Sequence, residues 1–251
     1  ACETDLDVNA DWKDITIVYS ILDPAQKIQY VRINKAFLGE GNALEYAQIP
    51  DSINYDTSYI KARIDEYRNG TVVQSMKLKP IWLPRENDPT SPFYNPDFPY
   101  ILVYAAQPQN YFKVSGTDTI WLNPDSEYHL EIFNLHSGET IKSSTILVKD
   151  FNITRPLYNP SKPYLKILNN DGQNTIKWRA GVNGRRYQVI YIFYYKETSS
   201  PGDTVIKTVD YQLGILKSQY TSGNEDMDIS FQGNSFYKFL GTSIPANSNV
   251  K

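Results

Sequence analysis

The chain has 251 residues, enough for one large domain or two ordinary ones with a sizeable core. Its 41% hydrophobic content excludes a disordered chain, and its net charge of −3 gives no cationic footprint for nucleic acid. No apolar run approaches the roughly 18 residues that a membrane-spanning helix needs. We therefore expect a globular protein that does not bind nucleic acid.

Residues 1–12 contain the single cysteine, Cys2, which rules out an intrachain disulfide and argues against a zinc site. A lone cysteine before an acidic run resembles the processing site of bacterial lipoproteins, where the cysteine is acylated. The acidic residues Glu3, Asp5 and Asp7 resemble the surface-export signal of Bacteroidetes-type lipoproteins. The resemblance implies a lipidated tether to the outer membrane that faces the cell exterior. The alternative is a chance cysteine near a terminus.

The next stretch predicts two strands and a short helix. Asp14–Leu22 and Lys27–Lys35 are rich in β-branched residues, and Asp23–Gln26 joins them as a turn because its proline fixes φ. A helix of one or two turns is expected over Ala43–Gln48, ending before Pro50.

The run from Tyr30 to Ala43 reads Tyr-Val-Arg-Ile-Asn-Lys-Ala-Phe-Leu-Gly-Glu-Gly-Asn-Ala. It resembles the amino-terminal region of a family of Bacteroidetes outer-membrane lipoproteins of unknown function. Members are often encoded near TonB-dependent receptors, so the resemblance implies an accessory role beside an outer-membrane β-barrel of that type. The family supplies no active-site residues. Its members continue with further strands, which leaves open whether the domain that ends at Lys251 is complete.

Asn69-Gly70 is the strongest short hairpin signal, because a two-residue turn of this kind requires positive φ. It predicts a hairpin of Tyr59–Arg68 with Thr71–Leu83. Downstream, Leu122–Val148 alternates apolar and polar residues, as expected of two further strands around a Ser-Gly turn. We expect these strands to form a first β-sandwich domain over residues 13–150.

A tyrosine corner is predicted at the entry to the last hairpin of this domain. Leu122, Pro124 and Tyr128 resemble that feature of immunoglobulin-like and fibronectin-type sandwiches. The expected fold class is therefore all-β, with two immunoglobulin-like or fibronectin-like sandwich domains and short helical insertions.

The loop Pro84–Pro99 contains five prolines, counting the two at its ends, so we expect no regular structure in it. Phe93, Tyr94 and Phe98 lie in it, and Tyr100 follows directly. A long loop with aromatic residues is a candidate site for a partner or ligand. The equal alternative is that these rings fold back onto the sandwich as a lid.

Residues 151–163 predict a proline-rich linker, and residues 164–251 a second β-sandwich. The strand Arg186–Glu197 is apolar on both faces, so we expect it to be central in its sheet. A brief helix is expected near the end, beginning at Asn234 or Ser235 and including Phe236, Phe239 and Leu240.

No catalytic motif is present. The pairs Asp65–Glu66 and Glu127–Glu131 have spacings that solvated strand faces produce, and Asn224–Asp228 lacks the regular loop of a calcium site. His136-Ser137 with Glu139 is expected to be a turn. We predict no catalytic residue, metal or cofactor.

The sequence thus predicts a non-enzymatic surface lipoprotein that acts as an accessory or binding subunit of an outer-membrane protein complex. The alternative is a stand-alone glycan-binding lipoprotein whose exposed rings stack on sugars. A third hypothesis is an enzyme on the same scaffold, because the fold does not decide the function.

Overall fold

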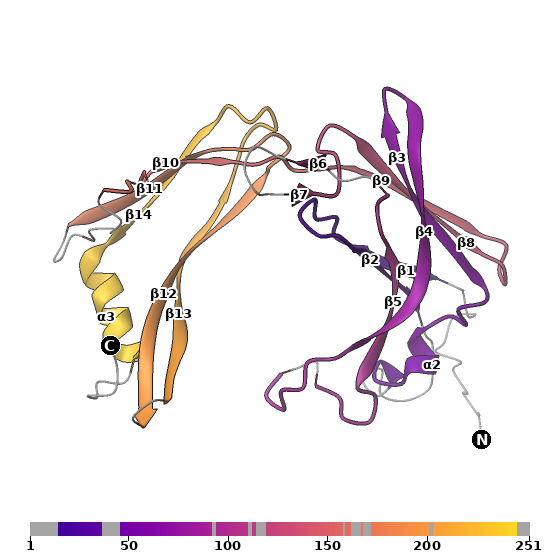
Figure 1. The fold of residues 1–251 in the computed structure, drawn as a ribbon, viewed down its shortest axis with the longest axis horizontal. Helices are drawn as coiled ribbons and strands as arrows, with labels where there is room; N and C mark the ends of the chain where they lie inside the picture. The colour runs from indigo at the N-terminus through magenta and orange to yellow at the C-terminus, as the bar shows by residue number, and fades with distance from the viewer. Residues whose placement is uncertain are drawn as a thin grey trace, which may run out of the picture. The chain divides into compact units, whose positions relative to one another are not determined.

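The computed structural model describes residues 15–36, 46–91, 94–109, 112–113, 119–157, 159–161, 167, 172–200 and 203–244. The chain separates into two compact units, residues 1–147 and 148–251. Both are built from antiparallel strands, with two short helices among the described residues (Figure 1). This confirms the predicted all-β fold class.

Unit 1 contains a seven-stranded sheet of order β1-β2-β5-β4-β3-β8-β9, together with a small ribbon of β6 and β7. In chain order its strands are β1 (Thr16–Ser20), β2 (Gln29–Lys35), β3 (Ile60–Arg68), β4 (Thr71–Pro84), β5 (Tyr100–Ala106), β6 (Phe112–Lys113), β7 (Thr119–Ile120), β8 (Glu127–Asn134) and β9 (Thr140–Ile146).

The long strand β4 belongs to both halves of this sheet. Its first part pairs with β3 as far as Leu78, and its last part, from Lys79, pairs with β5 (Figure 1). One buried cluster collects residues from β2 and β5 on one side and from β3, β4 and β8 on the other. The two halves therefore face each other across one core, as in a sandwich. We call the side toward this core the inner face and the opposite side the outer face.

Three local predictions in unit 1 are confirmed. The backbone N–H of Gln26 donates to the carbonyl oxygen of Asp23 at 3.1 Å, which closes the first turn. Asn69 and Gly70 both have positive φ, 51° and 76°, as the hairpin turn requires. The hydroxyl of Tyr128 donates to the carbonyl oxygen of Asn123 at 3.2 Å, which is the hydrogen bond of a tyrosine corner.

The helix predicted over Ala43–Gln48 is described only from Tyr46, which is helical and is followed by a turn at residues 47–48. Residues 43–45 of the predicted helix lie outside the described part of the chain. A further short helix that was not predicted, α2 (Pro50–Ile53), begins at the proline that was expected to follow the first one. Proline suits the first helical position, because its missing N–H has no partner there and its φ is already helical.

Unit 2 contains a three-stranded sheet of order β10-β11-β14 and a long two-stranded sheet of β12 and β13. Its elements are β10 (Asn152–Arg155), β11 (Gln173–Arg179), β12 (Arg186–Ser200), β13 (Asp203–Lys217), β14 (Asp226–Gln232) and α3 (Gly233–Ser243). The predicted carboxyl-terminal helix is thereby confirmed. The sequence Tyr164–Leu168 also predicts a strand, but only Ile167 of these residues is described.

The prediction that Arg186–Glu197 is a central strand is wrong. Among the described strands, β12 pairs only with β13. Figure 1 shows α3 beside this hairpin, and β13 contacts both α3 and β14. On that side the ring of Phe236 contacts the rings of Tyr191 and Tyr211, with centroids 5.3 and 5.4 Å apart. The other side leaves Ile192 and Tyr194 exposed. Apolar residues on both faces here reflect one packed face and one open face.

Candidate functional site

The predicted lipidation site Cys2, the acidic residues Glu3, Asp5 and Asp7, and the loop residue Phe93 lie outside the described residues. The other three candidate binding residues are described. Tyr94 is half-buried, Phe98 is 36% exposed, and Tyr100 is 54% exposed.

Short polar turns organise the described part of the loop that carries these rings. The Asp88 carboxylate accepts the N–H and the hydroxyl of Thr90, at 2.9 and 2.8 Å. The side-chain oxygen of Asn95 accepts the backbone N–H of Phe98 at 3.1 Å. At the base, the Arg85 N–H donates to the Pro99 carbonyl at 2.7 Å, which continues the pairing of β4 with β5.

The sequence analysis missed a further exposed ring at the base of this loop. Trp82 lies opposite Leu102, and Pro84 lies opposite Tyr100, so Trp82 and Tyr100 share one face of β4 and β5. Both are more than half exposed, although Leu102 on that face is buried in the core. The two rings thus extend the inner face beyond the end of the core. The two residues are 18 positions apart in the sequence, so their shared face is known only from the strand register.

The outer face at the free edge of the same sheet is apolar. Ile17 and Tyr19 on β1, Ile15 and Ile21 just beyond its two ends, and Tyr30 on β2 all lie there by the strand register. Tyr19 is 68% exposed and Ile21 is 89% exposed. No described strand pairs with the far side of β1. We call these five residues the β1 surface.

Two arginines lie on the same outer face. Arg32 lies opposite Tyr19 on β1 and two residues from Tyr30 on β2. Lys79 on β4 and Tyr30 on β2 both pair with Ala105 of β5, so Lys79 lies on the outer face. Arg85 is six residues after Lys79, just beyond the end of β4, and therefore lies on the same face. Each is half-buried, and each Nε is buried without a hydrogen-bond partner. Burial, and next the positive charge of Arg32, lower the pKa of Arg85, so the two guanidinium groups repel each other.

The outer face of β3, β8 and β9 is polar and forms a shallow pocket of about 360 Å³. Glu131 accepts Arg63 Nη2 and Lys142 Nζ, each at 3.0 Å. The rings of Tyr67 and His129 stack with their centroids 4.2 Å apart. Because the opposite charges here are already paired with one another, this pocket has no surplus charge to offer a ligand.

Of the two carboxyl pairs considered in the sequence, Asp65–Glu66 does not have the solvated arrangement that its spacing predicted. Asp65 and Glu66 are both buried, at 7% and 1% exposure, and they point to opposite faces of β3 as neighbours in a strand do. Glu127 and Glu131 are more accessible. The side chains of the first pair point apart, and those of the second pair are four residues apart along β8, so neither pair can act together on one reacting atom.

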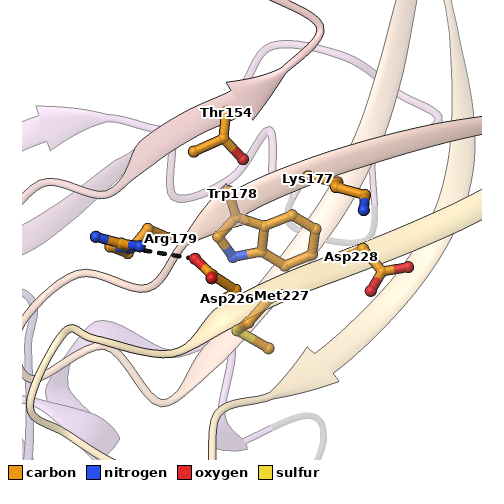
Figure 2. A pocket seen from close by; sticks show the side chains of 7 residues that line it. All are labelled: Thr154, Lys177, Trp178, Arg179, Asp226, Met227 and Asp228. Atoms are coloured by element: carbon orange, nitrogen blue, oxygen red, sulfur yellow. Dashed lines mark hydrogen bonds and ion pairs between the residues drawn. The ribbon is translucent and has the colours of Figure 1, made fainter.

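A second pocket, of about 290 Å³, lies on β10, β11 and β14 of unit 2 (Figure 2). Arg179 pairs with Asp226 at 3.2 Å, and Lys177 lies opposite Asp228. Trp178, between Lys177 and Arg179 in the chain, is 3% exposed, and its Nε1 has no hydrogen-bond partner. The charges of this pocket balance across the strands, so it favours no ion of either sign.

The acidic run considered for calcium serves the backbone instead. The Glu225 carboxylate accepts the N–H of Gln219 at 2.7 Å and that of Tyr220 at 3.3 Å. Within the described ranges, no three His, Cys, Asp or Glu side chains are grouped so that they could hold a metal ion. The trio around His136 is a turn, in which Asn134 accepts the His136 N–H at 2.9 Å.

No family model, curated protein or solved structure matches this chain. Of the helices in the described part, none is long and apolar enough to cross a bilayer. The β1 surface with Arg32 and Arg85 differs from a solvated protein exterior. It combines exposed apolar area, an open strand edge and unpaired positive charge, and these features suit binding.

Proposed function

We propose that this chain is a non-enzymatic surface lipoprotein that acts as an accessory subunit of an outer-membrane protein complex. In this proposal Cys2 carries the lipid, the protein faces the cell exterior, and its partner is a β-barrel of the TonB-dependent receptor type. The β1 surface is the docking site.

The observation that carries the proposal is the exposure of the β1 surface. Contact of apolar side chains with water is unfavourable, and contiguous exposed apolar side chains are typical of interaction sites. The free edge of β1 also offers backbone N–H and C=O groups that a partner strand can pair with. Thirteen residue steps join Cys2 to Ile15, and at roughly 3.5 Å each they reach at most about 45 Å. A lipid on Cys2 would therefore keep this surface near a membrane-embedded partner.

The test is gentle detergent extraction of the native protein, followed by identification of what co-purifies in stoichiometric amount. Ile17→Asp and Tyr19→Asp place a charge on the β1 surface and should abolish recovery of the partner. Val72→Asp is the matched control, because Val72 is an exposed apolar strand residue near the β3–β4 turn. Cys2→Ser should release the protein from the membrane fraction. Equal recovery with all three aspartate variants would refute the docking site.

Glycan binding is the second candidate, favoured by the exposed rings of Trp82 and Tyr100 on one face. Aromatic side chains offer flat apolar area with a polar rim, which suits stacking on sugar rings. A polysaccharide array with the wild type, Trp82→Ala and the control Tyr220→Ala tests it. Signal lost only with Trp82→Ala would support this candidate, and no signal with the wild type would exclude it for the glycans tested.

A further inference from the structure

Arg32 and Arg85 stand apart from three other arginines of the chain. Arg63, Arg68 and Arg179 each pair with a carboxylate on their own sheet, at 2.9, 2.6 and 3.2 Å. In the described part of the chain, no carboxylate pairs with the side chain of Arg32 or Arg85. These three arginines each have a counter-charge, whereas the described residues supply none for Arg32 or Arg85.

This arrangement costs free energy in the unbound protein. A buried donor without a partner loses its hydrogen bonds to water and gains nothing in return, and a charged donor loses more than a neutral one. Both buried Nε groups are in this state. Two like charges on one face of a sheet add repulsion. An anion seated between or beside the two guanidinium groups would remove both penalties.

We infer that Arg32 and Arg85 are the binding site for a carboxylate side chain of the protein partner that docks on the β1 surface. The inference rests on the proposed function and names the chemistry of the partner. Guanidinium groups bind carboxylates through paired N–H donors in a fixed geometry. Tyr19 and Tyr30, which flank Arg32 on the same face, supply the apolar and aromatic surroundings that are typical of the centre of a protein interface.

An opposing explanation is that the two charges only protect the open edge of β1 from pairing with other chains. Charges with that role would need no specific anion and would be replaceable by lysine. A carboxylate site requires the forked donors of arginine, so Arg32→Lys and Arg85→Lys should weaken partner binding nearly as much as glutamine substitutions.

The first experiment follows the side-chain Nε–H signals of Arg32 and Arg85 by NMR while succinate is added to the full chain. We expect saturable shifts of both signals, whereas sodium chloride at equal ionic strength produces none. The glutamine variants Arg32→Gln and Arg85→Gln assign the two signals. Absence of a succinate-specific shift would overturn the inference, and tighter binding of inorganic phosphate than of succinate would overturn the assignment to a carboxylate.

The second experiment repeats the co-purification with the Arg32→Gln/Arg85→Gln double variant. Loss of a buried charge pair should lower partner recovery on the order of thirtyfold or more. Lys79→Gln, which removes an exposed positive charge from the same face, should leave recovery unchanged. Full recovery with the double variant, together with loss for Ile17→Asp, would refute the carboxylate site and keep the docking site. If the wild type recovers no partner, the proposed function fails and the NMR result decides the anion site.

Discussion

Glu66 should stabilise unit 1 through its negative charge, although it is almost completely buried. Its side chain is 1% exposed on the inner face of β3. One carboxylate oxygen accepts Arg68 Nη2 at 2.6 Å and Ser126 Oγ at 2.7 Å, and the other accepts Gln74 Nε2 at 2.6 Å. Gln74 in turn accepts the backbone N–H of Gln109 at 3.1 Å. The network thereby joins β3, β4 and the segments that precede β8 and follow β5.

The substitution Glu66→Gln keeps the shape of the side chain and replaces one oxygen with an NH₂ group. That group must face either Gln74 Nε2 or the donors of Arg68 and Ser126, so at least one hydrogen bond becomes a contact between two donors. A charge-assisted hydrogen bond contributes about 1.5–3 kcal/mol, and a buried donor left unpaired costs about 1–3 kcal/mol. We expect the free energy of unfolding of unit 1 to fall by about 2–4 kcal/mol.

The loss should depend on pH. Burial by itself raises the pKa of Glu66, but hydrogen bonds from Ser126, Arg68 and Gln74 and the charge of Arg68 together lower it below the ordinary value of 4.5. A depressed folded-state pKa contributes stability that is present above the unfolded pKa and is lost as the pH falls through the folded pKa. The difference between wild type and Glu66→Gln should therefore be largest near neutral pH and shrink below about pH 4.

The assay is urea unfolding of the full chain, with hydrogen exchange read in peptides from β3 and β8 so that unit 1 is followed separately. Glu139→Gln, at an exposed position of the β8–β9 turn, is the control and should change little. A loss below about 0.5 kcal/mol for Glu66→Gln would refute the reasoning, since a single net hydrogen bond contributes at least that much. An equal loss at neutral and acid pH would refute the role of the charge.

Two further substitutions test local packing. Tyr128→Phe removes the hydroxyl that donates to Asn123 and should cost unit 1 about 1 kcal/mol, measured as a shift of the urea midpoint with an unchanged slope. Phe236→Ala removes a ring that is 1% exposed and contacts β12, β13 and β14, so it should cost unit 2 about 3–5 kcal/mol, measured by hydrogen exchange in those strands.

The features predicted well from the sequence are those set by a few neighbouring residues. Asn69-Gly70 determines its turn through the φ angles it allows, and the tyrosine corner depends on Tyr128 and a carbonyl five residues earlier. The carboxyl-terminal helix follows from local spacing of aromatic residues. The binding residues named from the sequence include Tyr100, which is exposed, but the lipidation residues lie outside the described part and stay a prediction.

The features missed from the sequence depend on which strands are neighbours. Glu66 has the spacing of a solvated strand residue, and only the positions of Gln74 and Ser126 show why it can be buried. The pairing of β4 with β5 places Trp82 and Tyr100 on one face, and the pairing of β5 with both β2 and β4 places Arg32 and Arg85 on another. No local sequence pattern encodes these pairings. Hydrophobicity along β12 could not show that β13 is its only partner among the described strands, because an open apolar face and a covered one have the same composition.

The two sides of the β4–β5 pairing separate stability from binding, and this gives a last prediction. Leu102 on the inner face belongs to the core, whereas Arg85 on the outer face pays a burial and repulsion cost without contributing to it. Arg85→Gln should therefore leave the free energy of unfolding unchanged or raise it by about 0.5 kcal/mol, because it removes like-charge repulsion. Urea unfolding measures this, with Arg63→Gln as the contrasting loss of a paired arginine. A substantial destabilisation by Arg85→Gln would mean that the guanidinium holds the loop base together, and the case for a residue reserved for a partner would fail.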